Sequence, residues 1–232
     1  MRTLGLLGGM SWESTAVYYR LLNEGAKARL GGLHSAPLLL WSCDFAPVAA
    51  QQAAGEWSAL GHLLGEAGRR LVQAGAQGLL ICTNTMHLLH GAVERASGVP
   101  VLHIADATGA ALRKAGCRKP VLLGTRFTME RDFYRARLAE RFGAEALVPD
   151  EPGRALVHRV IYDELCRGEV RDGSRDAVME VVRAMRSQGA DGLILGCTEL
   201  TLLLGAGDTD LPVFDTTALH AEAGLDVALA RG

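Results

Sequence analysis

The sequence predicts an α/β fold made of two similar domains, each built on a parallel β-sheet. Short apolar runs alternate with longer amphipathic segments along the 232 residues, the pattern of successive βαβ units. The second observation is an internal repeat. Gly75–Thr85 aligns without a gap with Gly189–Glu199 at a constant offset of 114 (75 to 189, 85 to 199). Each copy is a Gly-Ala-x-Gly turn, an apolar run and a small polar cluster, as expected of a buried strand with polar side chains at its carboxyl end.

Two further pairs of segments support the repeat. Leu6–Gly9 resembles Leu122–Thr125 at an offset of 116 (6 to 122), and Val99–Leu102 resembles Leu211–Phe214 at an offset of 112 (99 to 211). We therefore expect two parallel-sheet domains related by a pseudo-twofold axis, with the active site in the cleft between them.

The expected domain boundaries follow from the positions of these repeats. Residues 1–104 together with 205–232 are expected to form the first α/β domain, and residues 105–204 the second. The helix after Asp215 is expected to pack back on the first domain. Lys114–Pro120 provides a plausible turn between the two domains.

The strands are predicted from short runs that are apolar almost throughout, because helices cover both faces of a parallel sheet. They are Thr3–Leu7, Pro37–Ser42, Gly78–Cys82, Val99–His103, Val121–Gly124, Ala146–Pro149, Gly192–Gly196 and Val213–Asp215. The longer amphipathic segments between them predict helices. These are Glu13–Leu30, Gly55–Ala74, Met86–Ser97, Ala107–Ala115, Met129–Phe142, Ala155–Cys166, Arg175–Ser187 and Leu219–Ala230.

Composition and charge limit the classes of function. Hydrophobic residues make up 49% of the chain and the formal net charge is −2, so neither a nucleic acid nor an anionic membrane surface is indicated as partner. The apolar runs are too short to cross a bilayer, and no signal peptide is recognised. The five cysteines are widely spaced and odd in number, which does not suit a disulfide framework. We expect a cytoplasmic protein.

Polar side chains are predicted at the carboxyl ends of the strands, where ligands bind in open parallel sheets. The segments concerned are Gly8–Ser11, Cys43–Asp44, Thr83–Thr85, Thr125–Arg126 and Cys197–Glu199. Backbone N–H groups and hydroxyls at helix starts suit a small carboxylate, although the same residues could be simple helix caps. The loop Gly8–Ser11 lacks both the dinucleotide and the P-loop pattern.

Cys197 is the candidate base. It follows Gly196, and we expect a helix to begin just after it, which would lower the pKa of the thiol and favour the thiolate. The alternative is a buried cysteine without chemical function. His87 and His90 share a helix face, but no third ligand accompanies them, so no metal is expected. His87 could instead polarise a substrate or lie at a surface.

Three segments resemble the aspartate/glutamate racemase superfamily. They are Thr83–His87 (Thr-Asn-Thr-Met-His), Gly196–Leu200 (Gly-Cys-Thr-Glu-Leu) and Leu4–Thr15, and the resemblance extends over nearly the whole chain. It is nearest to the amino-acid racemase branch with a threonine–cysteine catalytic pair. The resemblance implies an isomerase that needs neither pyridoxal phosphate nor a metal, acts on a small amino acid and forms a homodimer. Its substrates would be aspartate, glutamate or a broader set of L-amino acids.

The resemblance also implies roles for single residues. Cys197 and Thr83 would flank the α-carbon, one in each domain, with Cys197 as the main base. The substrate-binding residues would be Gly9, Met10, Gln52, Asn84, Thr85, Thr198 and Glu199. Cys82 is an alternative second base, but neighbouring side chains of a strand point to opposite faces.

Some features that relatives use to bind an ω-carboxylate are missing. Residues 44–52 contain no arginine, and residues 162–166 contain no lysine. The first strand also lacks the acidic residue that glutamate racemases of cell-wall synthesis use beside their cysteine. Other reactions therefore stay open, namely a maleate-isomerase-like or hydantoin-racemase-like activity. A non-catalytic amino-acid-binding protein is the alternative from another class.

Overall fold

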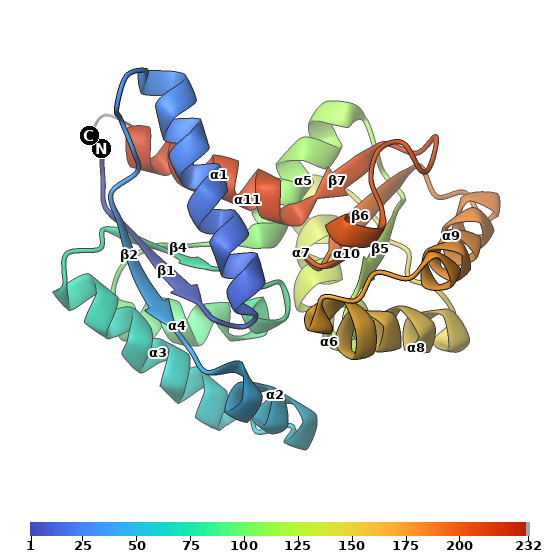
Figure 1. Ribbon diagram of the computed structural model, residues 1–232, viewed down its shortest axis with the longest axis horizontal. Coiled ribbons are helices and arrows are strands. Elements are labelled where there is room, and N and C mark those ends of the chain that lie inside the picture. Colours follow the sequence, from blue (N-terminus) through green and yellow to red (C-terminus); the bar gives the residue numbers. More distant parts are fainter. Residues whose placement is uncertain (231–232) are drawn as a thin grey trace. The chain divides into compact units, whose positions relative to one another are not determined.

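Two separate parallel β-sheets organise residues 1–230, the part of the chain that the computed structural model describes. The chain divides into two units around these sheets (Figure 1). Unit 1 contains Met1–Ile104 and the chain from His220 onward, and unit 2 contains Ala105–Leu219. Among the described residues, no helix combines the length and the apolar character that a membrane crossing requires.

The sheet of unit 1 has the strand order β2-β1-β3-β4, and each neighbouring pair is parallel. The strands are β1 (Leu4–Gly8), β2 (Leu38–Ser42), β3 (Gly78–Ile81) and β4 (Val101–Leu102). β1 and β3 are buried along their whole length, which explains their uniformly apolar sequences.

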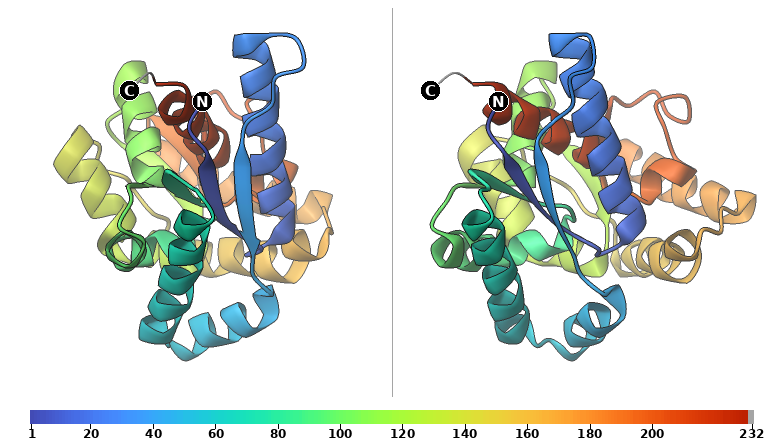
Figure 2. Two further views of the ribbon diagram at one scale, coloured as in Figure 1. Left: turned by 90° about the vertical axis from the view of Figure 1, so that its left-hand side faces the viewer. Right: turned by 60° about the vertical axis from the view of Figure 1, so that its left-hand side comes forward.

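Helices cover both faces of this sheet (Figure 2). On one face, α1 (Trp12–Leu30) and α11 (Thr216–Leu229) share a core cluster with Leu6 and Leu80. On the other face, α3 (Trp57–Gln73) and α4 (His90–Ser97) pack in a cluster that includes Leu7 and Leu79. The remaining elements of unit 1 are α2 (Phe45–Ala54) and the short 3-10 helix η1 (Thr85–Leu89).

The sheet of unit 2 has the parallel order β5-β6-β7. Its strands are β5 (Pro120–Gly124), β6 (Gly192–Gly196) and β7 (Val213–Asp215). The strand predicted over Ala146–Pro149 is reduced to one parallel bridge between Val121 and Leu147.

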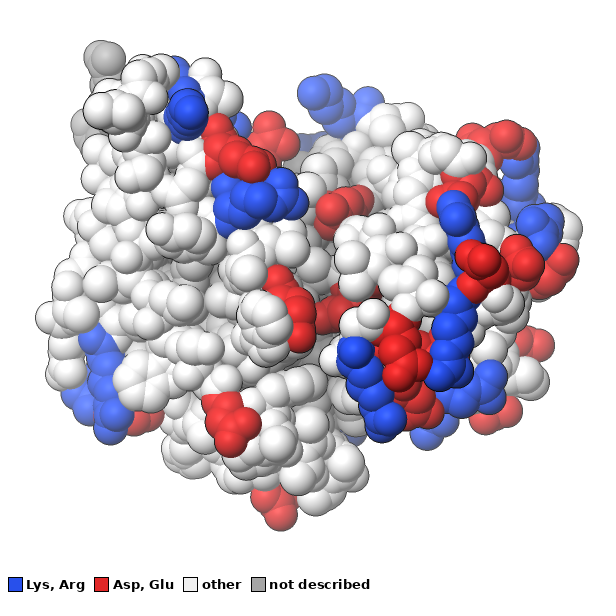
Figure 3. Space-filling model, viewed as in Figure 1, with Lys and Arg blue, Asp and Glu red and all other residues white. Residues whose placement is uncertain are grey.

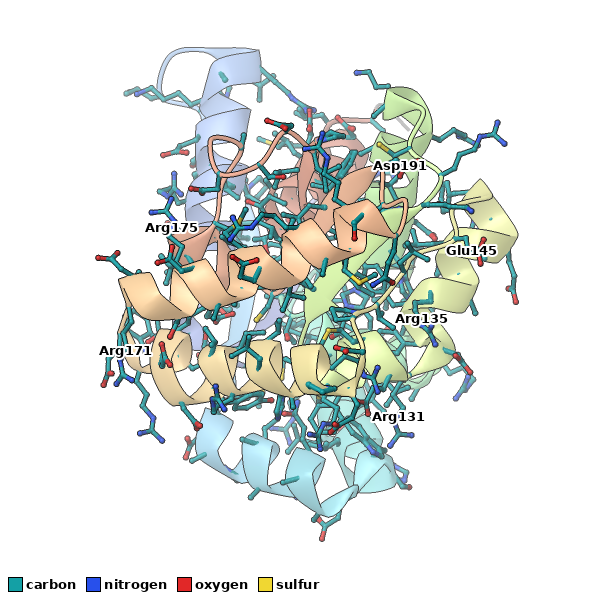
Figure 4. All side chains as sticks on the ribbon, turned by 90° about the vertical axis from the view of Figure 1, so that its right-hand side faces the viewer. Arg131, Arg135, Glu145, Arg171, Arg175 and Asp191 are labelled. Carbon is teal, nitrogen blue, oxygen red and sulfur yellow. The ribbon has the colours of Figure 1, made fainter. Side chains whose placement is uncertain are left out.

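The helices of unit 2 surround this sheet, and Figure 4 looks onto α8 and α9. They are α5 (Ile104–Ala115), α6 (Arg126–Glu130), α7 (Asp132–Phe142), α8 (Glu151–Arg159), α9 (Asp172–Ser187) and α10 (Leu200–Leu203). A π-helical turn η2 (Val160–Glu164) and a 3-10 turn η3 (Leu165–Arg167) follow α8, where one helix was predicted. One core cluster joins α8, η2, α9 and α10 to β5 and β6.

The exposed surface of α9 and its surroundings carries charges of both signs in pairs. Arg183 bonds Glu180, and Arg171 bonds Glu169. Figure 3 shows Lys and Arg side chains interleaved with Asp and Glu over this part of unit 2. Exposed pairs of this kind contribute little to stability, and they leave no large area of a single sign there.

The sequence repeat has a structural counterpart in each unit. The order β1-β3-β4 in unit 1 matches β5-β6-β7 in unit 2. The registers match too: Leu4 pairs with Gly78, and Pro120, 116 positions after Leu4, pairs with Gly192, 114 positions after Gly78. β7 pairs with β6, so residues 205–219, expected in the first domain, lie in unit 2.

Candidate functional site

The turn after β1 is held by hydrogen bonds within the protein. Gly9 has a φ of 82° and its N–H donates to Thr15 Oγ1 at 2.8 Å. A Cβ at Gly9 would overlap the main-chain O and N of Cys43, so only glycine fits. Met10, which follows it, is buried. The Gly9 amide, expected to hold an anion, is thus used by Thr15 instead.

Gln52 is buried on α2, although most glutamines at such a position are solvated. Its Nε2 lies 3.0 Å from Met86 Sδ. Met86 belongs to η1, the turn that follows β3. This contact fixes the Gln52 amide beside the polar segment at the end of β3.

The polar segment at the end of β3 enters the short helix η1. Thr83 is half-buried, whereas Asn84 and Thr85 are buried. The N–H of His87 donates to the main-chain O of Asn84 at 3.1 Å. The His87 ring turns back to the same segment, with Nδ1 at 2.9 Å from the main-chain O of Thr83.

Cys82 lies in the core of unit 1. It is fully buried in the cluster that α1 and α11 form with the sheet. Burial raises the pKa of the Cys82 thiol far above its ordinary value, which suits a core residue rather than a base.

The end of β6 places a thiol against a carboxylate. The Cys197 thiol donates to Glu199 Oε2, with 2.8 Å between Sγ and the oxygen. Glu199 is buried. Thr198, between them, shares a hydrogen bond of 2.5 Å with the hydroxyl of Thr217. Cys197, Thr198 and Glu199, three of the predicted site residues, therefore contribute two separate hydrogen bonds at the end of β6 in unit 2.

The electrostatics at Cys197 differ from the sequence-based expectation. Burial raises the pKa of the Cys197 thiol well above its ordinary value, and the Glu199 carboxylate and Cys166 raise it further. The expected lowering by a helix N-terminus is wrong, because α10 contains only Leu200–Leu203 and cannot outweigh these effects. At rest, Cys197 carries its proton.

Two residues that sequence reasoning did not select lie near this thiol. The phenol of Tyr162, on the π-helical turn η2, has a raised pKa through burial and through Cys197, Cys166 and Glu199. Tyr162, Cys166 and Cys197 all pack against the same core cluster. Turns of this π-helical type are frequent at functional sites, but the periodicity of the sequence does not predict one here.

The turns that follow β3 and β6 have the same hydrogen bond. In unit 1 it runs from His87 N to Asn84 O, and in unit 2 from Thr201 N to Thr198 O, each 3.1 Å long. The donors and the acceptors both differ by 114 (87 to 201, 84 to 198), the offset of the sequence repeat. Thr83 and Cys197 hence occupy equivalent positions in their own units.

A group of histidines in unit 1 was also not foreseen. His87, His103 and His220 are buried, and their rings gather near β4 with the half-buried His90. Tyr18 bonds His220. Within residues 1–230, no group of three or more His, Cys, Asp or Glu side chains is arranged to hold a metal ion.

Comparison with known proteins identifies a family that the chain resembles over nearly its whole length. Residues 7–224 match the model of the Asp/Glu/hydantoin racemase family. The broad specificity amino-acid racemase RacX of Bacillus subtilis (strain 168) is 23% identical over 230 residues, which is 98% of each chain.

Solved structures agree with this family match. A candidate Asp/Glu racemase from Yersinia pestis is 51% identical with a TM-score of 0.93, and covers 99% of this chain and 100% of its own. An aspartate racemase homologue from Pyrococcus horikoshii OT3 is 32% identical with a TM-score of 0.85, at the same coverage of 99% and 100%. The chain belongs to the Asp/Glu/hydantoin racemase family.

Proposed function

We propose that the protein is a cofactor-independent amino-acid racemase that inverts the α-carbon of aspartate, glutamate or a broader set of L-amino acids. Family membership supports the reaction type. The substrate range takes its support from relatives described as an amino-acid racemase of broad specificity and as aspartate racemase homologues.

The observation that carries this proposal is the pair formed by Cys197 and Glu199. The half-buried Cys197 thiol donates to a carboxylate at 2.8 Å and so has a ready acceptor for its proton. Transfer of the proton from Sγ to the carboxylate leaves a thiolate without changing the net charge of the pair. An incoming substrate ammonium group would favour this transfer, because a nearby positive charge stabilises the anionic sulfur.

In the proposed reaction, the Cys197 thiolate removes the α-proton and the electron pair of the C–H bond passes into the substrate carboxylate. The electron pair returns to Cα as Thr83 gives its hydroxyl proton to the opposite face. After the cleft opens, water reprotonates the Thr83 oxygen, and the hydroxide that is left takes the proton from Glu199, which restores the resting pair of thiol and carboxylate. A hydroxyl is a weaker acid than a thiol, so protonation from the Thr83 side is the slower half of the reaction.

Unit 1 supplies Thr83 and unit 2 supplies Cys197 in this proposal. We propose that the pseudo-twofold relation of the units brings the two residues to opposite faces of the substrate in a cleft. Closure of the cleft would exclude water and strengthen every hydrogen bond to the developing carbanion.

The remaining predicted residues would hold the substrate rather than exchange protons. Thr85 and Thr198 would bind the α-carboxylate with the main chain at Met10, beside Gly9. Asn84 and Gln52 would bind the amino or side-chain end. Glu199 would first take up the thiol proton and would then contact the substrate as a neutral carboxyl group, with the ammonium group closer to Sγ than to Glu199.

The proposal is tested by α-proton exchange in deuterated water, followed by mass spectrometry and chiral chromatography with a panel of amino acids. Cys197→Ser should abolish exchange, while Cys117→Ser, at a buried cysteine of unit 2 that precedes β5, should leave it intact. Unchanged exchange in Cys197→Ser would remove this thiol from the mechanism. Tight amino-acid binding by the unaltered protein without any exchange would favour a binding protein.

The opposite side of the reaction has its own test. Thr83→Cys would put a stronger acid in place of the hydroxyl and should speed racemisation. If this variant folds and racemises no faster than the unaltered protein, the paired arrangement of Thr83 and Cys197 is wrong. The homodimer stays a prediction, which sedimentation velocity tests.

A further inference from the structure

The ring of His87 lies between two main-chain carbonyl groups of unit 1. Its Nδ1 is 2.9 Å from the O of Thr83, and its Nε2 is 3.4 Å from the O of Leu102. A carbonyl oxygen only accepts hydrogen bonds, so a neutral His87 can satisfy one of these contacts and not both. The tautomer of His87 therefore decides which segment it holds.

The neighbouring His220 bears on this choice, because it contacts the same Leu102 oxygen. Its Nε2 lies 3.1 Å from the same Leu102 oxygen, so that nitrogen carries the proton and donates. Its Nδ1 then accepts from the Tyr18 hydroxyl at 2.8 Å. Leu102 O thus has one donor already and is not left unpaired when His87 donates to Thr83 O. The contact of His87 to Thr83 O is also the shorter of its two contacts. These distances favour the tautomer of His87 with the proton on Nδ1.

The surroundings of His87 keep its ring neutral. The ring centroid of His103, which follows β4, is 4.9 Å away, and that of His220, on α11, is 5.3 Å away. The ring of His90, on α4, lies next to that of His103, with 4.9 Å between the ring centroids. Burial lowers the pKa of His87 well below its ordinary value, and His220 and His90 lower it further. A second proton on Nε2 is therefore disfavoured.

The bond to Thr83 closes the turn at the end of β3. The main-chain N–H of His87 donates to Asn84 O at 3.1 Å, and its ring donates to Thr83 O. Two successive carbonyl groups are thus held by one residue, and with them the backbone that carries the Thr83 side chain.

We propose that His87 is a positioning residue for Thr83: its Nδ1–H fixes the main chain at the end of β3, and the bond between Tyr18 and His220 favours the tautomer required. This inference rests on the proposed role of Thr83 as the acid on one face of the substrate. A shift of about 1 Å in such a group can slow a reaction on the order of 100-fold.

The tautomer is measured directly on the unaltered protein. Long-range ¹H–¹⁵N NMR correlation at neutral pH distinguishes a proton on Nδ1 from one on Nε2. The proposal expects His87 with the proton on Nδ1 and His220 with the proton on Nε2. Tyr18→Phe should weaken the preference of both rings. An Nε2–H tautomer at His87 in the unaltered protein would overturn the proposal, whatever its activity.

Two variants at position 87 separate the two ring nitrogens. The amide of asparagine can replace Nδ1, and the amide of glutamine can replace Nε2. His87→Asn should therefore keep inversion close to that of the unaltered protein, and His87→Gln should lower it on the order of 100-fold. His90→Gln is the matched control, because His90 uses Nε2 to bond Val101 O at 2.8 Å and does not touch Thr83.

The ratio of inversion to α-proton exchange separates positioning from a general loss of structure. If only Thr83 is displaced, Cys197 still removes and returns the proton on its own face. His87→Gln should then exchange deuterium with little inversion, whereas a generally damaged protein loses both. Equal inversion in the Asn and Gln variants would contradict the positioning role. Absence of exchange in the unaltered protein would contradict the proposed function and leave the tautomer measurement to decide on the hydrogen bond.

Discussion

At the scale of single residues, the pair of Cys197 and Glu199 makes an unusual prediction. The carboxylate raises the pKa of the thiol by its charge and by accepting its hydrogen bond. Glu199→Gln removes both effects, so the pKa of Cys197 should fall, although burial keeps it above its ordinary value. Exchange of the α-proton should nevertheless fall on the order of 100-fold or more, because the amide cannot take up the thiol proton.

The two halves of this prediction are measured separately. Thiolate absorbance against pH reports the pKa of Cys197, with Cys197→Ser as the blank for the other cysteines. Exchange in deuterated water reports activity. A Glu199→Gln variant that keeps full activity would show that the carboxylate is not the proton acceptor, and that Cys197 ionises by another route.

At the scale of elements, the turn between β1 and α1 depends on a glycine. Gly9→Ala would force a Cβ into the main chain of Cys43 and impose a positive φ on alanine. We expect a loss of about 3 kcal/mol or more in the free energy of unfolding. Gly31→Ala is the control, since Gly31 has a φ of 75° but no atom within 4 Å of an added Cβ. Its cost should be about 2 kcal/mol, because a φ of 75° with a ψ of −176° is a conformation that essentially only glycine adopts.

Urea unfolding of the two variants compares these costs under identical conditions. The difference between them isolates the overlap with Cys43 from the backbone conformation. Equal losses in Gly9→Ala and Gly31→Ala would mean that the β2–α2 connection moves aside easily, and that the turn is not held by close packing.

The same elements explain which parts of the fold the sequence could predict. β1, β3, β5 and β6 are buried throughout, so their apolar runs and the glycines that begin or end them were visible in the sequence. α2 was not predicted, because a proline such as Pro47 near the start of a segment is typical of a loop. In the structure, Asp44 caps this helix, and its side chain accepts from Ala46 N at 3.3 Å. The π-helical turn η2 packs in the core of unit 2, and no pattern in its own sequence predicts it.

For the candidate site, the repeat could predict the two strand ends but not their electrostatics. An offset of 114 identifies Thr83 and Cys197 as equivalents. It cannot show that Cys197 lies half-buried against Glu199, in surroundings that reverse the expected direction of the shift in the thiol pKa. Nor can it reveal His103 and His220, which are 117 residues apart (103 to 220) and meet His87 only through the fold of unit 1.

At the scale of the whole molecule, the chain returns to unit 1 only after completing unit 2. β7 is the last strand of the second sheet, and α11 then carries the chain from Thr216 back into unit 1 at His220. The first unit thus needs both ends of the chain for its core, since Ala221, Leu225 and Ala228 complete the cluster around Leu4. His220, which bonds Tyr18 and Leu102 O, lies at the point of return.

This buried histidine predicts how the stability of the protein depends on pH. Burial lowers the pKa of His220 to about 4, whereas an unfolded histidine titrates near 6.5. The folded protein therefore binds fewer protons than the unfolded chain between these values. The contribution of His220 is complete above pH ~6.5 and is lost as the pH falls toward 4, by about 2 kcal/mol at pH 5.

The measurement is urea unfolding of the unaltered protein and of His220→Gln at pH 8 and pH 5. Glutamine does not titrate, so the loss of stability between the two pH values should be smaller in this variant by about 2 kcal/mol. His34→Gln, at an exposed histidine of the same unit, should behave as the unaltered protein. If His220→Gln and the unaltered protein lose the same stability between pH 8 and pH 5, His220 takes up a proton in the folded state without cost. Burial of His220 then does not reduce the stability of the protein in acid.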